Sequence, residues 1–230
     1  MGETGLSDVV LGLVMMCVDD PKDRDAISLV SGADLEVLAK SRGRALQALK
    51  LGKCCGFSTD GLLHVGRVQL RILFLEESSI IEKDGQWLHE IAINISFLDT
   101  LNFYMTNLVR VSFEDLELTV RNCLYLASVK VRDSENLDLV GFFRAASVLE
   151  EFCGSSVNEE PEMHAAVSFP PRLCCLGITY IRNNELPVVF PFASLLKKLD
   201  LIYALLNTED HCLLIQRCPN LEALKYKKYI

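Results

Sequence analysis

The sequence has no apolar run long enough to cross a membrane. The apolar stretch nearest the N-terminus, from Val9 to Val18, has ten residues, whereas a membrane-spanning helix needs about 20. No basic segment precedes it, as one would in a secretory signal peptide. We therefore expect no membrane as a partner.

An excess of basic residues is also missing. Against 31 Asp and Glu the chain has 23 Lys and Arg, which gives a net charge of −8. Domains that bind nucleic acids normally carry a basic stripe. The composition therefore argues against nucleic acid as a partner.

Signatures of catalysis are lacking too. The sequence contains no G-x-S-x-G, no P-loop and no H-E-x-x-H. His211 stands between Asp210 and Cys212, but neighbours on a helix point about 100° apart and do not converge on one atom. We expect the protein not to be an enzyme.

The cysteines are too sparse for a disulfide scaffold. Nine are spread over 230 residues, whereas secreted scaffolds are usually shorter and denser in cysteine. This pattern predicts reduced thiols and a location in the nucleus, the cytoplasm or both. Cys54–Cys55 and Cys174–Cys175 are adjacent pairs. Successive strand residues point to opposite sides, so we expect packing roles, with Cys55 under a turn, and no metal site.

What the sequence does contain is a repeat. The hexad LKKLDL, which begins at Leu196, has the pattern L-x-x-L-x-L. Related hexads begin, in chain order, at Leu46, Leu70, Leu98, Leu126, Leu149, Leu173 and Leu221. The eight starts are 23 to 28 residues apart. This period and pattern are the signature of leucine-rich repeats.

The spacing predicts an α/β solenoid in the form of a partial horseshoe. Each x-L-x-L segment should form a short strand whose apolar residues point to one side. The first leucine of each hexad should also point inward from the turn before the strand. Because one repeat cannot bury this face alone, the repeats should stack into a parallel inner sheet with outer helices.

Between the hexads, three segments have helical periodicity: residues 84–95, 113–123 and 209–218. The expected N-caps of the three are Lys83-Asp84, Ser112 and Thr208, in the same order. The residues expected to face the core are Trp87, Leu88, Ile91 and Ile95, then Leu116, Val120 and Cys123, then Cys212 and Ile215, with Leu214 as a further candidate. Pro187 and Pro191 predict an irregular outer segment over 185–192.

The first 30 residues do not follow the repeat. Apolar residues from Val9 to Cys17 predict one helix, and Pro21 predicts the start of a second. An apolar helix, an acidic turn with proline and a second helix ending in Leu29-Val30 resemble the first half of an F-box. On this pattern alone, a pair of capping helices for the solenoid is an equal alternative. We thus divide the chain into partial F-box helices over 1–30 and about eight leucine-rich repeats over 31–230.

Several segments together resemble one plant family. They are DPKDRDAISLV, DGLLHV, EKDGQWLHE, LNFYMT, LVGFFRAA, LEEFCG, FPFASLLKKLDLIYALL and TEDHCLLIQRCPNLEAL. The sequence is similar to the coronatine-insensitive family of jasmonate co-receptors, which are F-box leucine-rich-repeat proteins related to the auxin receptors. The resemblance implies a substrate-receptor subunit of an SCF ubiquitin ligase. It also implies that a Skp-type adaptor and its cullin complex bind the F-box, through Leu13, Val14, Pro21 and Leu29.

The sequence also departs from this family. After Leu29-Val30, the stretch DLEVLAKSRGRALQALKL resembles a helix and strand from repeats further along. We therefore expect an internal deletion of the third F-box helix and the first repeats, and a truncation of the horseshoe after Ile230.

The family resemblance implies a pocket for jasmonoyl-isoleucine and an inositol phosphate, and a surface for the degron of a JAZ-type repressor. Such ligands need converging Arg and Lys, but Lys50, Lys130 and Arg132 belong to different repeats. We expect no cofactor in this chain, because the family's pocket segments are absent. Tyr203 and Lys227 match family positions near the degron, and strand parity places Lys225 and Lys227 on the inner face.

Two functions remain open from the sequence. The first is an impaired SCF substrate receptor in jasmonate signalling. The alternative is a truncated leucine-rich-repeat scaffold that binds neither hormone nor adaptor. For Tyr203 and Lys227, an ordinary strand-end aromatic and a solvated basic tail are the corresponding alternatives.

Overall fold

All eight hexads form strands in the computed structural model, which describes residues 31–42, 46–66, 69–81, 86–104, 112–135, 138–156 and 168–228. Each strand begins two residues after the first leucine of its hexad. The strands are β1 (Ala48–Lys50), β3 (Ile72–Phe74), β5 (Thr100–Asn102), β6 (Ser128–Glu135), β7 (Glu151–Ser156), β8 (Cys175–Arg182), β9 (Lys198–Leu205) and β10 (Ala223–Lys228). The predicted strand positions are confirmed.

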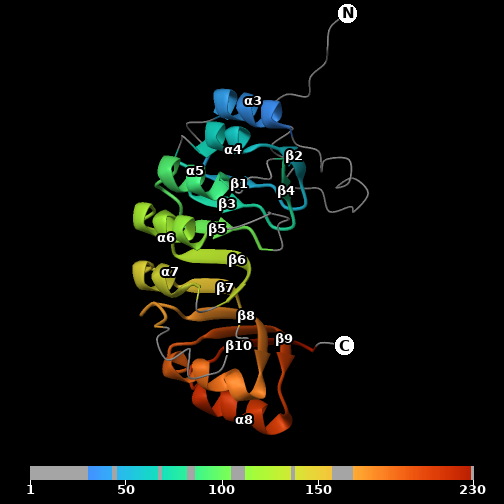
Figure 1. The fold of residues 1–230 in the computed structure, drawn as a ribbon, viewed down its shortest axis with the longest axis vertical. Helices are drawn as coiled ribbons and strands as arrows, with labels where there is room; N and C mark the ends of the chain where they lie inside the picture. The colour runs from blue at the N-terminus through green and yellow to red at the C-terminus, as the bar shows by residue number, and fades with distance from the viewer. Residues whose placement is uncertain are drawn as a thin grey trace, which may run out of the picture.

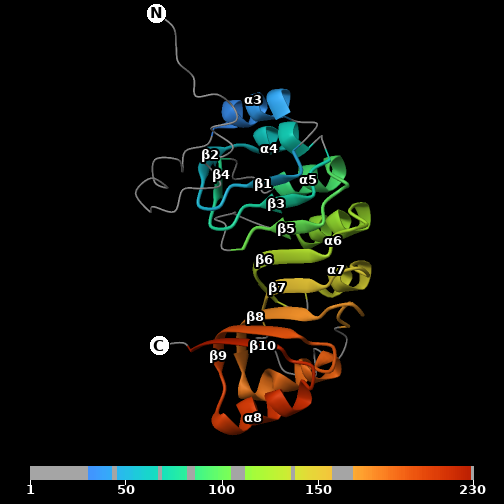
Figure 2. The same ribbon diagram turned by 180° about the vertical axis from the view of Figure 1, so that it is seen from behind.

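These strands form one parallel sheet. Its order, β1-β3-β5-β6-β7-β8-β9-β10, is the order of the chain, and every pairing is parallel. In both ribbon views the colours run in sequence order along the long axis, so each repeat lies beside its neighbours in sequence (Figures 1 and 2). The predicted solenoid with a parallel inner sheet is confirmed.

A shared hydrogen-bond pattern fixes the start of the inner strands. One carbonyl of each repeat accepts two successive N–H groups of the next. The Ala127 oxygen, for example, accepts from the amides of Glu150 and Glu151 at 2.8 and 2.9 Å. The same pattern recurs from β1 to β10. Because these groups pair between repeats, only stacked repeats satisfy them.

Helices cover one face of the sheet. They are α3 (Gly32–Arg42), α4 (Thr59–Gly66), α5 (Trp87–Asn94), α6 (Phe113–Asn122), α7 (Val140–Ala145) and α8 (Thr208–Arg217). Two 3-10 helices, η2 (Asn183–Val188) and η3 (Phe190–Phe192), replace an α-helix in the repeat with Pro187 and Pro191. Proline lacks an N–H and disfavours a regular interior turn, so the irregular outer segment is confirmed.

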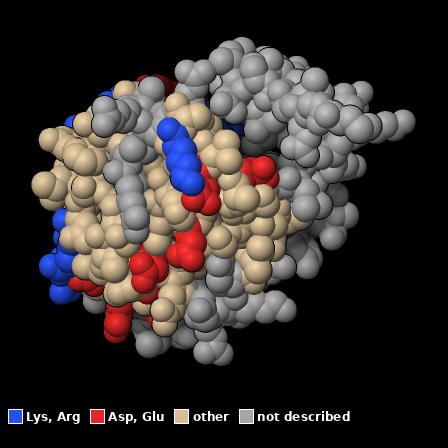
Figure 3. Space-filling view, turned by 90° about the horizontal axis from the view of Figure 1, so that it is seen from above, with Lys and Arg blue, Asp and Glu red and all other residues tan. Residues whose placement is uncertain are grey.

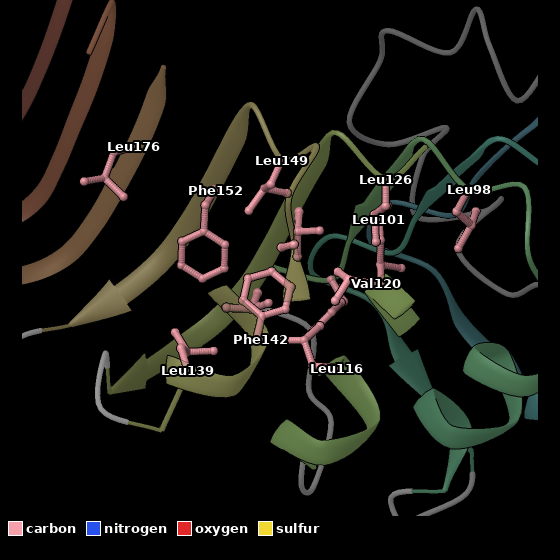
Figure 4. Packing of buried hydrophobic residues seen from close by; sticks show 14 of the residues in the cluster. Leu98, Leu101, Leu116, Val120, Leu126, Leu139, Phe142, Leu149, Phe152 and Leu176 are labelled. Carbon is pink, nitrogen blue, oxygen red and sulfur yellow. The ribbon is translucent and has the colours of Figure 1, made fainter. Parts of the chain in front are cut away.

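The core lies between the sheet and the helices. Phe152 projects from β7 toward Phe142 of α7, as Figure 4 shows, and Leu101, Leu116 and Leu176 belong to the same buried cluster. The first leucines of the hexads from Leu70 to Leu196 are at most 1% exposed. Each buried side chain of this size contributes about 1.5–3 kcal/mol by leaving water.

The helix predictions are confirmed for α6 and for the inward residues of α5, but not in detail for α8. The helix α5 begins after Gln86 and not after Lys83-Asp84. All the residues expected to face inward from the first two are buried, and Ser112 caps α6 by accepting from the Asp115 amide at 3.2 Å. In α8, Leu214 is buried, while Cys212 is exposed and Ile215 is 54% exposed. The helix α8 packs against η2, and Leu214 belongs to the buried core cluster. Its N-cap is Asn207, not Thr208, because the Asn207 side chain accepts from the Asp210 amide at 2.8 Å.

A second, two-stranded parallel sheet pairs β2 (Cys55–Phe57) with β4 (Ser79–Ile80). The chain reaches each of these strands through a turn with one left-handed residue, Lys53 at φ 61° and Glu77 at φ 57°. In the first of these turns Cys54 is buried and Cys55 is exposed. The expectation that Cys55 lies under the turn was therefore wrong by one residue.

The helices predicted over residues 1–30 lie outside the described part of the chain. Within the described part, none of the helices combines the length and apolarity needed to cross a membrane. Seen from the α3 end, the described basic side chains lie among neutral and acidic residues (Figure 3).

Candidate functional site

The inner face of the sheet is built from alternate residues of β5 to β10. The row of paired residues that crosses the middle of these strands points to the opposite face and is buried against the helices. It consists of Leu101, Val129, Phe152, Leu176 and Leu199, which are at most 2% exposed. The rows on either side face away from the helices. They are Thr100, Ser128, Glu151, Cys175, Lys198 and Ala223, and Asn102, Lys130, Cys153, Gly177, Asp200 and Lys225.

A shallow cavity of about 100 Å³ lies on this face over β6 to β10. We call its polar lining the inner-face patch, which consists of Lys130, Glu151, Cys153, Cys175, Lys198, Asp200 and Lys225. These residues come from five consecutive repeats and lie about one strand spacing apart. The patch therefore exists only in the stacked solenoid.

One edge of the inner-face patch is an ordered ion pair. Lys130 Nζ lies 3.0 Å from Glu151 Oε1, and the Ser128 hydroxyl donates to Glu151 Oε2 at 2.6 Å. Burial opposes ionisation of Glu151, but the bonds from Ser128 and Lys130 outweigh it and lower the pKa of this carboxyl. Burial likewise opposes the charge of Lys130, but its bond to Glu151 leaves the lysine pKa raised. Both groups are thus charged at neutral pH.

At the base of the inner-face patch, the Cys153 thiol packs on Gly177. A Cβ on Gly177 would collide with the Cys153 sulfur, so only glycine leaves room for that side chain. Burial raises the pKa of the Cys153 thiol to about 11. Cys153 is therefore a protonated packing residue at neutral pH.

The rest of the inner-face patch alternates in charge. Asp200 lies opposite Lys225 in the register of β9 and β10, and Lys198 precedes it on β9. Lys225 faces the cavity, as strand parity predicted. Such alternation suits a partner segment that itself carries both signs of charge.

The predicted degron residues lie at the C-terminal side of the inner-face patch. Tyr203 is partly buried in β9. Lys227 lies in β10, where the register with β9 shifts between Tyr226 and Lys228, and its side chain lies outside the described part. Lys50 is far away in β1, while Lys130 is in β6. As expected, these lysines do not converge.

An aromatic neighbour of Tyr203 was missed from the sequence. Tyr180 pairs with Tyr203 in the register of β8 and β9. The Arg182 guanidinium donates to the Tyr180 hydroxyl at 2.8 Å and lies 5.2 Å from its ring centre. Both tyrosines stand seven residues after the first leucine of their hexads. An alignment of the repeats on that leucine would have revealed the pair.

The described residues contain no cluster of three or more His, Cys, Asp and Glu that could hold a metal ion. His211 Nδ1 contacts the backbone oxygen of Asn207 at 2.8 Å, and its ring packs on Tyr226. His89 Nδ1 lies 2.8 Å from Asp115 Oδ1 and joins α5 to α6 on the outer face.

Comparison with known proteins gives a family match for the N-terminal segment and homologues for most of the chain. An F-box matches residues 3–31. Coronatine-insensitive protein 1 of Arabidopsis thaliana is 54% identical over 207 residues, which are 88% of this chain and 35% of that protein. The chain is a homologue of the coronatine-insensitive proteins. The F-box interpretation of the N-terminal segment is thereby confirmed over the alternative of capping helices.

Further relatives match over nearly the same share of the chain at lower identity. Coronatine-insensitive protein homolog 1a of Oryza sativa subsp. indica is 51% identical over 205 residues, which are 87% of this chain and 34% of that protein. GRR1-like protein 1 of Arabidopsis thaliana is 29% identical over 206 residues, which are 85% of this chain and 35% of that protein. The chain spans about a third of the length of the curated relatives that it matches.

Proposed function

We propose that this chain is a substrate-receptor subunit of an SCF-type ubiquitin ligase in plant jasmonate signalling, in the nucleus, the cytoplasm or both. The observation that carries the proposal is the union of an F-box at residues 3–31 with a leucine-rich-repeat solenoid in one chain. Its role is non-catalytic, and other subunits transfer ubiquitin.

The two parts divide the work. The F-box binds a Skp-type adaptor and through it the cullin complex, with Leu13, Val14, Pro21 and Leu29 as the proposed contacts. The inner-face patch binds the protein to be degraded. Because each repeat adds one strand, the patch is a rigid, extended surface.

The charges of the inner-face patch favour a protein segment as its ligand. Jasmonoyl-isoleucine has one carboxylate and an inositol phosphate has several negative groups, so both need converging cations. Here Lys130 is already paired with Glu151, and Asp200 lies among the remaining lysines. We propose that this chain alone binds a degron of mixed charge, of the JAZ-repressor type, near Tyr203 and Lys227, and does not bind the hormone.

Capture of the full chain on an immobilised plant Skp-type adaptor tests the proposal. We expect capture of the unaltered chain and its loss in Leu13→Glu, because a buried carboxylate in an apolar interface is costly. Lys225→Glu is the matched control, since it changes charge on the inner-face patch and should leave capture intact. Loss of capture in both variants would point to general misfolding, which circular dichroism would detect.

Failure of the unaltered, folded chain to bind the adaptor would overturn the proposal. It would favour the alternative of a leucine-rich-repeat scaffold that acts without a ligase. Saturable binding of jasmonoyl-isoleucine to the chain alone, measured by calorimetry, would contradict the second part of the proposal.

A further inference from the structure

The chain has two pairs of adjacent cysteines, which differ in exposure and in the distance between their sulfurs. Cys174 Sγ lies 3.9 Å from Cys175 Sγ, and both residues are partly exposed. Cys54 is buried with its sulfur 3.6 Å from the Gly52 oxygen, whereas Cys55 is exposed. Within the described residues, this second pair makes no sulfur–sulfur contact.

The backbone explains why the sulfurs of Cys174 and Cys175 meet. In an extended strand, successive N–H groups and successive side chains point to opposite sides. Here both N–H groups donate to one oxygen, that of Glu150, at 2.9 and 3.0 Å. Side-chain alternation is therefore broken between these two residues. The expectation that adjacent cysteines point apart was wrong for this pair.

The neighbouring repeats hold this arrangement in place. The Cys174 carbonyl in turn accepts from the amides of Lys197 and Lys198 at 2.8 and 3.0 Å. The pair is thus tied to the strand before it and to the strand after it. The first leucine of the hexad, Leu173, is fully buried just before the pair. The two thiols are consequently positioned before any ligand arrives.

We propose that Cys174 and Cys175 form a dithiol site for trivalent arsenicals, at the edge of the inner-face patch. Arsenic(III) is soft and prefers sulfur ligands, and one arsenic atom can join both thiols into a ring. A disulfide would need the sulfurs at about 2.0 Å. An arsenic atom between the sulfurs keeps them further apart, nearer to the separation found here.

The reaction balances without an oxidant. Phenylarsine oxide and two thiols give a phenyl dithioarsenite and one water. Two S–H bonds break, two As–S bonds form, and both protons leave on the arsenical oxygen while arsenic stays trivalent. Burial raises the pKa of Cys175 to about 11, so this thiol is protonated at neutral pH. The protonated form is the one that the balanced reaction consumes.

Titration of the reduced full chain with phenylarsine oxide tests the site. We expect a mass increase of one phenylarsenic group at the tightest step and the protection of two thiols from iodoacetamide. Cys174→Ser and Cys175→Ser should each raise the half-saturating concentration by about 100-fold or more, because the second thiol acts at high effective concentration. The dithiol 2,3-dimercaptopropanol should reverse binding far better than a monothiol.

The second cysteine pair supplies the matched control. A Cys54→Ser/Cys55→Ser double variant should keep the affinity of the unaltered chain. Loss of tight binding in this control, or its retention in Cys174→Ser and Cys175→Ser, would overturn the proposal. If circular dichroism shows that a serine variant is misfolded, peptide mapping of the unaltered chain identifies the protected cysteines instead. Protection must then fall on Cys174 and Cys175, and protection elsewhere would refute the site.

Discussion

The N-terminal and C-terminal repeats start their inner strands in the same way and end them differently. The three N-terminal strands β1, β3 and β5 have three residues each, whereas β6 to β10 have six to eight. The hexad therefore determines where a strand begins, while the residues after it determine how far the strand runs.

The cause of this difference lies in the turns. After β1 and β3 the chain bends away through Lys53 and Glu77 in the left-handed region, and enters the small sheet of β2 and β4. In the C-terminal repeats the strands pass through register shifts and continue. Gly154, at φ 111°, lies beside such a shift in β7. Glycine tolerates this conformation without a steric cost.

The cores of the two regions differ as well. The described N-terminal repeats pack mainly aliphatic residues, and Trp87 contacts Phe103 at 5.2 Å between ring centres. The C-terminal repeats share a run of phenylalanine rings. Phe152 contacts Phe143 at 5.0 Å, Phe143 contacts Phe169 at 4.6 Å, and Phe169 contacts Phe192 at 4.1 Å.

The largest expected effect concerns this aromatic run. Phe152→Ala should lower the free energy of unfolding by about 3–5 kcal/mol, since it leaves a cavity in a packed core. Urea unfolding followed by circular dichroism measures the change. Leu224 occupies the same register row in β10 but is 36% exposed, and Leu224→Ala should cost less than about 1 kcal/mol. Equal losses would show that burial within this row does not determine the cost of truncation.

A pH dependence should appear in both regions. Burial raises the pKa of Cys123, near the end of α6, to about 11 from an ordinary value of 9.0. Burial also raises the pKa of Cys153, in the C-terminal region, to about 11. Unfolding returns each thiol to its ordinary pKa, so the unfolded chain releases the proton first as the pH rises. Stability should therefore fall between about pH 9 and 11, by roughly 2–3 kcal/mol per thiol.

Urea midpoints measured across this pH range check the expectation. Cys123→Ala and Cys153→Ala should each flatten the decline, because alanine has no proton to release. An unchanged slope in both variants would contradict it.

A smaller loss is expected at the bulge that lengthens β7. In Gly154→Ala the new Cβ would meet the Val131 carbonyl oxygen in a left-handed conformation, which should cost roughly 2 kcal/mol. Gly52→Ala is the N-terminal control, because its nearest neighbour would be the Phe74 ring at an ordinary 3.5 Å. Thermal melts of the two variants give the comparison, and equal melting temperatures would refute the role of Gly154.

The smallest effect is a gain. Lys53→Gly should stabilise the chain by about 0.5–1 kcal/mol, because glycine relieves the left-handed strain. The exposed ion pair with Glu77 that it removes is 3.4 Å long and contributes little. Lys50→Gly, in the adjacent strand β1, should instead destabilise by a similar amount. Chemical denaturation distinguishes the signs, and destabilisation by both would show that the N-terminal turn is unstrained.

Much of the fold was predictable because the repeat is local. The hexads located all eight strand starts, and apolar spacing identified the helices α5 and α6 with their buried residues. The inward face of α8 was misjudged because Cys212, Leu214 and Ile215 are all apolar. In the structure α8 packs against η2 of the repeat before it, and of these three residues only Leu214 is buried. Of the candidate site, the sequence indicated Lys225 on the inner face but missed Tyr180 beside Tyr203.

The sequence by itself determined the period, the parallel order of the strands, the irregular proline-rich repeat and the homology to F-box proteins. These depend on side-chain patterns within 23 to 28 residues. Only the tertiary structure decided which neighbours meet across repeats. It paired Lys130 with Glu151, placed Cys153 over Gly177 and brought the sulfurs of Cys174 and Cys175 together. The physical reason is that hydrogen bonds between strands set the register and the local backbone direction, which no single repeat contains.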